Sequence, residues 1–386
     1  MGMSYCMLNG VRLAAVYAAV PQKEIRLEDE LEYYGGSLKK AERARKMLGT
    51  DRRRIAWPGI TASDLCKAAA RRLLEEQSVD RKTIDALIFV SQSPDYDLPA
   101  TACVLQHELG LSATCAAFDV NQGCAGYVYG LWLAATLVSS GACGQVLLLV
   151  GDACCAPRDP ANRITTPLFG DGGSASLICR DDNASPMHFS LGTNGAGYKA
   201  IIVPGGRSRL PYKRDFEENR IFFEDIYTPA GTPWRLNGVY MNGGEVFQFT
   251  LEIVPAHLRD FMAQAGTNPE QVDWLFLHQA NRQIVEMVAE KAGFPVEKAP
   301  WQSFSRYGNL SSASIPIAIC DQFGGAGTSG AGNFLLCGYG VGLSWASCFL
   351  KTEGITCGSV LDFCHKDDAP GREERIRRWI AVLSEE

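Results

Sequence analysis

Cys124 stands where a short apolar run ends and an apolar helix is predicted to begin. The segment FDVNQGCAGYVYGLWLAATLVSSG (118–141) has β-type residues at its start, then a turn of small and polar residues, then a helical pattern that begins at the cysteine. The N–H groups of a first helical turn and the helix dipole favour a thiolate at such a position. Cys124 is therefore a candidate nucleophile rather than a passive packing residue.

His278 and Asn309 are candidate hydrogen-bond donors for the same chemistry. His278 follows the apolar run of DWLFLHQ (273–279), and Asn309 lies at the start of GNLSSASIPIAICDQF (308–323). A neutral imidazole N–H and a carboxamide N–H can stabilise negative charge that develops on a substrate oxygen during a reaction. Each residue also has an ordinary structural interpretation, because a histidine at a strand end usually serves packing and an asparagine is a favoured helix N-cap.

The chain contains an internal repeat that relates the surroundings of these residues. Three apolar runs in the first half have counterparts in the second half, in the same order and at similar separations. The matching pairs are DALIFVSQ (85–92) with DWLFLHQ (273–279), QVLLLVGD (145–152) with NFLLCGYG (333–340), and GDGGSASLIC (170–179) with GVGLSWASCFL (340–350). Cys124 lies 39 residues after Asp85 and Asn309 lies 36 residues after Asp273, so the two residues take corresponding places.

The elements that must position these side chains follow from the same pattern. Strands that alternate with helices at this spacing indicate an α/β protein with mostly parallel mixed sheets and helices between and around them. We expect two halves, residues 1–180 and 181–350, related by a pseudo-twofold axis and followed by an extension over residues 351–386. Equivalent turns of two such halves meet near the axis, so the three side chains are expected to face one pocket.

Composition limits the classes of protein that remain. With 386 residues, 46% hydrophobic and 21% charged, the chain can bury a large core, and its net charge of −6 argues against a general nucleic-acid binder. No stretch reaches the ~20 apolar residues that span a bilayer, and the first residues lack a basic segment before an apolar one. The fourteen cysteines are scattered without a CxxC pair, so we expect reduced thiols, no metal site, no membrane association and a cytoplasmic enzyme.

Four motifs in a fixed order carry a resemblance to a known family. They are GCAG (123–126), HQAN (278–281), GNLSSAS (308–314) and GYGVGLSW (338–345). Over roughly residues 50 to 350 the chain resembles the β-ketoacyl-[acyl-carrier-protein] synthase III enzymes. The resemblance implies a five-layered, thiolase-like αβαβα fold and a homodimer. It also implies a triad of Cys124, His278 and Asn309 that condenses an acyl thioester with a malonyl thioester on a carrier protein, without a bound cofactor.

A second site for negative charge is expected at the glycine-rich turn GYGVG (338–342). Glycines let a main chain approach a reacting oxygen closely, so the backbone N–H groups of Cys124 and Val341 are candidates for an oxyanion hole. A plain tight turn is the alternative. The turn lacks the lysine of a phosphate-binding loop.

The entrance to the pocket is described by the resemblance alone. It implies that Arg163 and Asn281 lie near coenzyme A or pantetheine, and that Leu98 crosses the dimer interface to line the neighbouring acyl tunnel. Arg43 stands where the family has a tryptophan that stacks on adenine, so the aromatic platform is missing. A guanidinium plane can also stack on adenine and meet phosphate, which leaves both coenzyme A and a carrier protein open as acyl donors.

Two charged or amphipathic regions bear on partners. The densest positive stretch could steer an acidic carrier protein or be an ordinary solvated face; it consists of Arg43, Arg45, Lys46, Arg52, Arg53 and Arg54. In the extension, Ile376, Trp379, Ile380 and Leu383 fall on one helical face, which we expect to dock on the core or on a dimer partner. Residues 204–240 resemble a family insertion whose role the sequence leaves open.

Four alternative functions remain at this point. A type III polyketide synthase shares the triad, but HQAN differs from its HPGG-like string. A thiolase needs a second catalytic cysteine, and Cys337 has the wrong offset from the glycine turn. A specialised acyltransferase could keep the triad and pass the acyl group to oxygen or nitrogen. An inactive partner subunit of a condensing pair is the fourth, and the intact triad argues against it.

Overall fold

The computed structural model describes residues 4–153, 165–228, 231, 233–325, 329–364 and 370–384. Its α-helices are α1 (Leu38–Leu48), α2 (Ala62–Glu76), α3 (Thr101–Glu108), α4 (Gly126–Ser139), α5 (Phe216–Asn219), α6 (Gly243–Ala265), α7 (Arg282–Lys291), α8 (Gln302–Tyr307), α9 (Ser314–Phe323) and α11 (Arg372–Ser384). Its strands are β1 (Ser4–Leu8), β2 (Val11–Pro21), β3 (Glu24–Arg26), β4 (Arg52–Arg54), β5 (Ala86–Val90), β6 (Ala116–Val120), β7 (Gln145–Asp152), β8 (Gly172–Arg180), β9 (Met187–Thr193), β10 (Ile201–Ile202), β11 (Ile226–Tyr227), β12 (Pro233–Trp234), β13 (Tyr240–Met241), β14 (Trp274–Leu277), β15 (Ser329–Gly340), β16 (Ser344–Cys357) and β17 (Leu361–Phe363).

Two similar half-sheets make up the main mixed sheet of eleven strands. The first half-sheet has the order β2-β8-β7-β5-β6, and the second has the order β9-β16-β15-β14 with β1 added outside β9. In both, two antiparallel pairings are followed by a parallel one, namely β7 with β5 and β15 with β14. The end of β16 pairs with β2 and joins the two half-sheets.

The internal repeat seen in the sequence is present in the main chain. Asp85 accepts the backbone N–H of Gln145 at 3.1 Å, and Asp273 accepts the backbone N–H of Asn333 at 2.8 Å. In each half the acceptor precedes its donor by 60 residues. An aspartate in the equivalent position of each half therefore binds the start of the neighbouring parallel strand.

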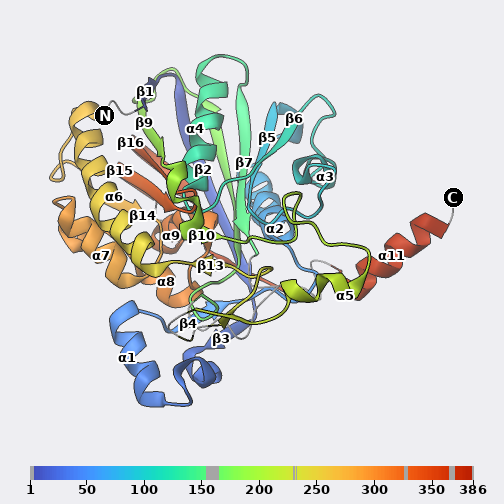
Figure 1. Cartoon of the computed structure of the whole chain (residues 1–386). Coiled ribbons are helices and arrows are strands. Elements are labelled where there is room, and N and C mark those ends of the chain that lie inside the picture. The colour runs from blue at the N-terminus through green and yellow to red at the C-terminus, as the bar shows by residue number, and fades with distance from the viewer. Residues whose placement is uncertain are drawn as a thin grey trace.

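Helices separate and cover the half-sheets, which gives five layers (Figure 1). Helices α4 and α9 pack between the two half-sheets in the largest apolar cluster. Helices α2 and α3 cover the outer face of the first half-sheet, and α6 and α7 cover the outer face of the second. Burial of apolar area on four sheet faces is the main stabilising term of such an arrangement.

The alternation of side chains along a buried strand explains why the central strands are apolar throughout. In β7, Val146, Leu148 and Val150 belong to the cluster around α4, whereas Leu147 and Leu149 belong to the cluster under α2. Successive side chains of a strand point to opposite faces, and both faces of this sheet are covered by helices. A run such as QVLLLVGD is therefore the pattern that a doubly covered strand requires.

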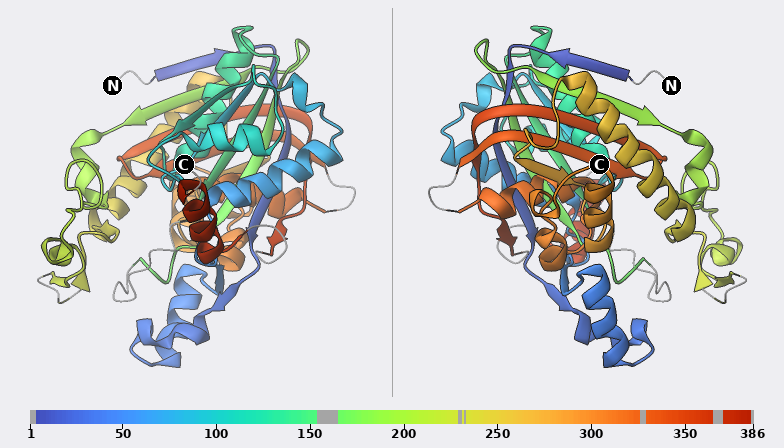
Figure 2. Two further views of the ribbon diagram at one scale, coloured as in Figure 1. Left: turned by 90° about the vertical axis from the view of Figure 1, so that its right-hand side faces the viewer. Right: turned by 90° about the vertical axis from the view of Figure 1, so that its left-hand side faces the viewer.

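Three parts project from the layered core (Figures 1 and 2). A lobe built from β3, α1 and β4 extends at one end. Residues 204–240 form a segment with the β11–β12 hairpin and α5, held to the core by the β10–β13 pair. Helix α11 extends away on another side. No helix among the described residues is both long and apolar enough to cross a bilayer.

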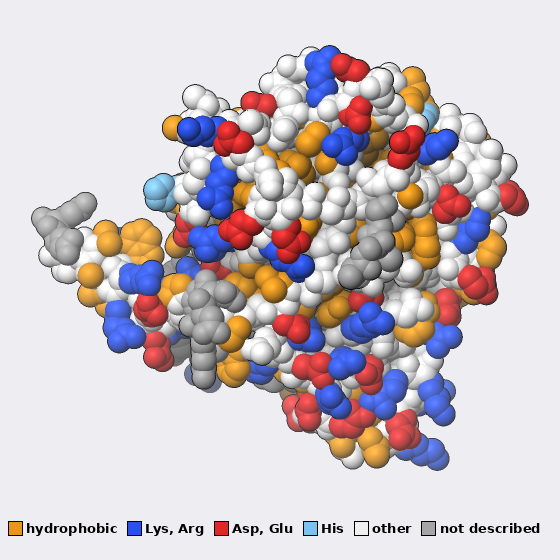
Figure 3. Space-filling view, turned by 180° about the vertical axis from the view of Figure 1, so that it is seen from behind, with side chains coloured by type: hydrophobic (Ala, Val, Ile, Leu, Met, Phe, Trp, Pro, Cys, Tyr) orange, Lys and Arg blue, Asp and Glu red, His pale blue; other side chains and the backbone are white. Residues whose placement is uncertain are grey.

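Acidic side chains accompany most of the predicted positive stretch. Figure 3 shows basic and acidic side chains interspersed over the lobe, and ion pairs account for four of the six cations. The pairs are Arg45 with Glu28 and Asp51, Arg52 with Glu24, Arg53 with Glu30, and Arg54 with Asp362. Only Arg43 and Lys46 lack an acidic partner among the residues that the structure places, so the free positive surface is smaller than the sequence suggested.

The C-terminal extension has one docked part and one projecting part. Strand β17 adds to β2 in parallel register. Helix α11 touches the body through an ion pair of Arg375 with Asp64 and an edge-on contact of Trp379 with Tyr96, whose ring centroids lie 6.3 Å apart. Trp379 is 51% exposed and Ile380 is 61% exposed, so a single subunit leaves most of the predicted apolar face uncovered.

Candidate active site

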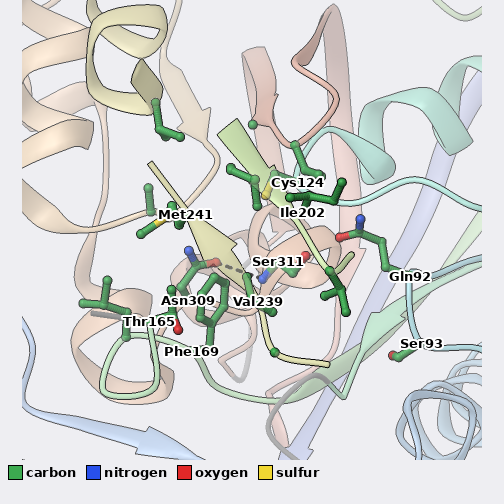
Figure 4. A pocket seen from close by; sticks show the side chains of 18 of the residues that line it. Gln92, Ser93, Cys124, Thr165, Phe169, Ile202, Val239, Met241, Asn309 and Ser311 are labelled. Atoms are coloured by element: carbon green, nitrogen blue, oxygen red, sulfur yellow. Dashed lines mark hydrogen bonds between the residues drawn. The ribbon is translucent and has the colours of Figure 1, made fainter. Parts of the chain in front are cut away.

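One cavity of about 1090 Å³ lies between the two halves and contains the three predicted catalytic residues. Cys124 reaches it from the first half, and His278 and Asn309 reach it from the second. Figure 4 shows Cys124 and Asn309 facing the same space, with Ile202 and Met241 beside them. The structure therefore brings together three side chains that are up to 185 residues apart in the chain.

Cys124 lies in the turn between β6 and α4. The helix begins at Gly126, two residues later than predicted, because the N–H of Gly126 closes a tight turn on the carbonyl of Gly123 at 2.6 Å. The end of β15 packs directly against the cysteine. A Cβ added to Gly340 would lie 2.7 Å from the Cβ and 2.8 Å from the Sγ of Cys124, so this position accommodates only glycine.

The surroundings of Cys124 keep its sulfur protonated at rest. Burial raises the pKa of the Cys124 thiol to about 11, and the charge of Asp152 acts in the same direction. Hydrogen bonds from the backbone of Val341 and from the Ser311 hydroxyl lower it by less. The prediction of a resting thiolate at the helix start is therefore wrong, because loss of hydration outweighs the few N–H dipoles that reach the sulfur.

His278 directly follows the last residue of β14, and its imidazole is buried. Nδ1 shares a hydrogen bond of 2.8 Å with the Ser314 hydroxyl, and the ring meets Tyr339 edge-on at 5.7 Å between centroids. Burial lowers the pKa of His278 to about 4, and the backbone of Ser311 opposes this shift. The imidazole is therefore neutral at physiological pH. When the Ser314 hydroxyl donates to Nδ1, the ring proton lies on Nε2 and is available to a ligand.

Asn309 is held by its own turn and does not cap α9. Its Oδ1 accepts the N–H of Ser311 at 3.0 Å, and its backbone N–H donates to Leu168 at 2.8 Å. The backbone N–H of Gly170 donates to its carbonyl at 3.0 Å. Because Oδ1 is used internally, the amide N–H2 is the part of the side chain left to act as a donor in the cavity.

Ser311 contacts all three predicted catalytic residues. Its N–H orients Asn309, its hydroxyl acts on Cys124, and its backbone acts on His278. Ser311 has a φ of +50°, a left-handed conformation that is uncommon outside glycine. Neither Ser311 nor the nearby Asp152 was predicted as a site residue; the three serines of GNLSSAS (308–314), in an otherwise apolar segment, were the available signal.

The predicted entrance residues are not all placed at the cavity. Asn281 lines it, and its side chain caps α7 by accepting the N–H of Ile284 at 2.9 Å. Arg43 is exposed on α1 and is absent from the cavity lining. Leu98 is 82% exposed and does not reach the cavity of its own subunit. Arg163 falls outside the described residues.

The cavity is lined by both polar and apolar groups. Phe247, Val239, Ile202 and Met241 supply apolar surface, and the last three come from the segment that includes the insertion. No cluster of three or more His, Cys, Asp or Glu side chains suited to a metal ion occurs within the described ranges. A cavity with one half-buried thiol, two neutral donors and apolar walls suits an acyl thioester.

Comparison with known proteins places this geometry in a family. Sequence models described as 3-oxoacyl-[acyl-carrier-protein] synthase III and as its C-terminal part match residues 118–195 and 262–352. A putative 3-oxoacyl-[acyl-carrier-protein] synthase 3 from Campylobacter jejuni is 33% identical over 91% of this chain and 96% of its own length. The chain belongs to the 3-oxoacyl-[acyl-carrier-protein] synthase III family.

Solved structures agree with this synthase III assignment. A 3-oxoacyl-(acyl-carrier protein) synthase from Burkholderia xenovorans superposes with a TM-score of 0.84 at 36% identity, covering 94% of this chain and 99% of its own. The priming β-ketosynthase of the R1128 polyketide pathway superposes with a TM-score of 0.74 at 26% identity, covering 90% and 97%. The predicted thiolase-like fold is confirmed, and the protein is a condensing acyltransferase of the synthase III family.

Proposed function

We propose that this synthase III enzyme loads an acyl group onto Cys124 and condenses it with a malonyl-type thioester by decarboxylation. The observation that carries the proposal is the meeting of one half-buried thiol and two buried, neutral N–H donors in a single cavity. The names of the relatives add the substrate class, because they describe synthases that act on acyl-carrier-protein thioesters.

The first step is acyl transfer between two sulfurs. The sulfur of Cys124 attacks the donor thioester, the carbonyl oxygen becomes an oxyanion, and the N–H groups of Cys124 and Val341 stabilise it. The bond to the donor sulfur then breaks. The thiol proton of Cys124 leaves with the donor, so one acyl-enzyme and one free thiol form.

The second step makes the carbon–carbon bond. Loss of carbon dioxide from the malonyl group leaves an enolate whose oxygen accepts the Nε2–H of His278 and the Nδ2–H of Asn309. The enolate carbon attacks the acyl carbonyl, and the bond to the sulfur of Cys124 breaks. The products are a β-ketoacyl thioester, carbon dioxide and the thiolate of Cys124, which takes up one proton from solvent to regenerate the thiol.

A panel of acyl thioesters with intact-protein mass spectrometry tests the first step. We expect one acyl mass on the wild type and none on the Cys124→Ala variant. Adding a malonyl thioester is then expected to remove the acyl mass with release of about one carbon dioxide per acyl group. Loss of the acyl group to an alcohol or amine without carbon dioxide would instead show the oxygen- or nitrogen-acylating alternative.

A homodimer is part of the same proposal. Strand β6 is an edge of the main sheet, and Phe118 on it is 36% exposed. Leu98 is 82% exposed on the loop after β5. An unpaired edge strand flanked by exposed apolar residues is suited to pairing with a second copy. Light scattering after size-exclusion chromatography is expected to give twice the chain mass of 42.0 kDa.

The proposal includes carrier-protein thioesters as substrates and the cytoplasm as the location of the enzyme. Eleven cysteines among the described residues, with Cys364 left aside, carry free thiols, as expected in a reducing compartment. Arg43 and Lys46 are the two cations of the positive stretch that form no ion pair with a described side chain, and they could meet an acidic carrier protein. Reversing both charges is expected to raise the KM for carrier-bound substrate at low salt; an unchanged KM would show that the lobe does not guide the carrier.

A further inference from the structure

Asp152 ends β7 and joins the two turns that border the reacting part of the cavity. The residue is fully buried. Its Oδ1 accepts the backbone N–H of Gln92 at 2.8 Å and the hydroxyl of Ser91 at 3.2 Å. Its Oδ2 accepts the backbone N–H and the hydroxyl of Ser312 at 3.1 Å and 2.7 Å. One carboxylate therefore links the turn after β5 to the turn that carries Asn309.

The carboxylate of Asp152 is a buried charge held by hydrogen bonds alone. No Lys, Arg or His among the described side chains forms an ion pair with it. Burial raises the pKa of Asp152, while bonds from Gln92, Ser311 and Ser312 oppose that shift. Because each oxygen accepts one backbone N–H and one or more hydroxyls, the arrangement suits the ionised form.

This charge acts on the sulfur of Cys124. After burial, Asp152 is the group that raises the pKa of the Cys124 thiol. Both residues that Asp152 binds pack against the Cys124 turn, because a Cβ added to Gly123 would meet the Gln92 side chain and one added to Gly126 would lie 3.2 Å from the Cβ of Ser312. The Ser311 hydroxyl lowers the pKa of both the thiol and the carboxylate. A negative charge near a thiol disfavours the thiolate, and the low polarity of the surroundings strengthens the effect.

The two hydrogen bonds from Ser312 to Asp152 also help to orient Asn309. Ser312 lies in the 3-10 turn Ser311–Ala313, and the first residue of this turn donates its N–H to Asn309. That first residue has the uncommon φ of +50°. Such a conformation persists only where neighbours hold it, and the two bonds from Ser312 to Asp152 do so.

Resting on the proposed roles of Cys124 and Asn309, we propose that Asp152 is a positioning residue with two effects. It holds the Asn309 turn against the cavity, which supports the decarboxylation step. Its negative charge disfavours the thiolate of Cys124 in the free enzyme, so that the sulfur loses its proton only when an acyl donor enters the cavity. Asp152 touches no substrate and acts through its neighbours.

The Asp152→Asn variant separates these effects because it removes the charge with little change in shape. The first measurement is the pH profile of Cys124 alkylation by iodoacetamide, followed on the Cys124 peptide by mass spectrometry. We expect the midpoint to fall by about one unit relative to the wild type, since a like charge has been removed. The second measurement is the rate of decarboxylation relative to the rate of acyl loading, which we expect to fall about tenfold or more.

The Ser312→Ala variant keeps the charge of Asp152 and removes one hydrogen bond, the one from the Ser312 hydroxyl. We expect it to lower the ratio of decarboxylation to loading while leaving the alkylation midpoint unchanged. It also tests the proposal where Asp152→Asn fails to fold. Asp171→Asn is the matched control, because Asp171 is likewise fully buried and accepts the backbone N–H of Ala56 at 2.8 Å; its alkylation midpoint should equal that of the wild type.

The outcomes distinguish this proposal from the proposed function. A folded Asp152→Asn variant with a wild-type midpoint and a wild-type ratio would overturn the positioning role, as would a proportional loss of both steps in Ser312→Ala. If the wild type itself takes up no acyl group, the proposed function fails. The alkylation midpoint still reports in that case whether Asp152 controls the sulfur.

Discussion

Each side chain at the reacting centre depends on a neighbour for its state. The Ser311 N–H holds the carboxamide of Asn309, the Ser314 hydroxyl holds the imidazole of His278, and burial sets the protonation of Cys124. Enzymes gain most from donors that are already aimed at the charge that develops in the transition state. The residue types alone do not fix the orientation of these donors. The serines of the Asn309 turn are therefore as much a part of the site as the residues that they orient.

Replacing Asn309 by alanine should separate the two proposed steps. The carboxamide N–H stabilises only the enolate, so Asn309→Ala is expected to lower decarboxylative condensation by about 100-fold, while acyl loading of Cys124 changes little. Radiolabelled carbon dioxide release and intact mass measure the two steps. Asn268→Ala is the control, because Asn268 also accepts a backbone N–H, from Gln271 at 3.1 Å, but lies outside the cavity lining. Equal losses in both steps would contradict the assigned role.

A buried histidine outside the cavity should make stability depend on pH. His257 shares a hydrogen bond of 2.9 Å with Ser347, and burial lowers its pKa to about 4. Below its ordinary pKa of 6.5 the unfolded chain binds a proton that the folded chain refuses, so the free energy of unfolding is complete above pH 6.5 and falls between pH 6.5 and 4. The loss approaches about 3 kcal/mol for this group.

His257→Gln is expected to make this part of the pH profile less steep, because glutamine keeps a polar partner for Ser347 and does not titrate; the remaining slope includes the share of His278, whose pKa burial also lowers to about 4. Urea unfolding at pH 7.5, 6 and 5 measures the change. The exposed His107→Gln variant is the matched control and should keep the slope of the wild type. A slope in His257→Gln as steep as that of the wild type would show that other groups cause the acid sensitivity.

At the scale of elements, the end of β15 decides how closely the second half approaches the nucleophile. Gly338 and Gly340 both pack against the Cys124 turn; a Cβ on Gly338 would lie 2.7 Å from the Cα of Ala125. This close approach brings the backbone of Val341 to the sulfur. The glycines of GYGVG are therefore needed mainly for the close packing of the two halves, and less for the conformation of the turn.

A methyl group at position 340 should disrupt this contact. Gly340→Ala places a Cβ within 2.8 Å of the Cys124 sulfur and requires a side chain at a φ of +152°. We expect acyl loading to fall at least tenfold, equivalent to about 1.4 kcal/mol in activation free energy, with the fold retained. Loading kinetics and thermal melting measure the two. Gly195→Ala, where an added Cβ meets nothing within 4 Å, should load at the wild-type rate.

At the scale of the whole molecule, several apolar groups stay uncovered in one subunit. Leu98, Phe118 and Trp379 are exposed, and they belong to the loop after β5, the edge strand β6 and helix α11. Scattered exposed apolar residues are ordinary on a protein surface. Their association with an unpaired sheet edge is what supports the proposed dimer.

The dimer predicts that Leu98 affects chemistry in the neighbouring subunit. If Leu98 lines the partner's acyl tunnel, Leu98→Trp narrows that tunnel and shifts the preference toward shorter acyl groups. Competition between short and long acyl thioesters, read by mass on Cys124, measures the shift. Met7→Trp is the control, because Met7 is 50% exposed on β1, away from β6 in the sheet order. An unchanged preference in Leu98→Trp would remove Leu98 from the tunnel.

Local patterns were sufficient to predict much of the architecture. Runs such as QVLLLVGD and DWLFLHQ became β7 and β14, because a strand covered on both faces must be apolar at every position. The repeat was readable because both halves use an aspartate to fasten the same strand pair. The start of α4 was predicted two residues early, because the tight Gly123–Gly126 turn has no distinct sequence signal.

The amino-acid sequence by itself determined which groups are available: one cysteine at a strand–helix turn, a histidine at a strand end and an asparagine in a serine-rich turn. Tertiary structure alone decided their states. Burial made Cys124 a thiol, and a carboxylate from β7 reached the Asn309 turn 160 residues away. Acidic neighbours also neutralised most of the positive stretch. Hydration and charge depend on what lies within a few ångströms in space, and a linear pattern does not contain those neighbours.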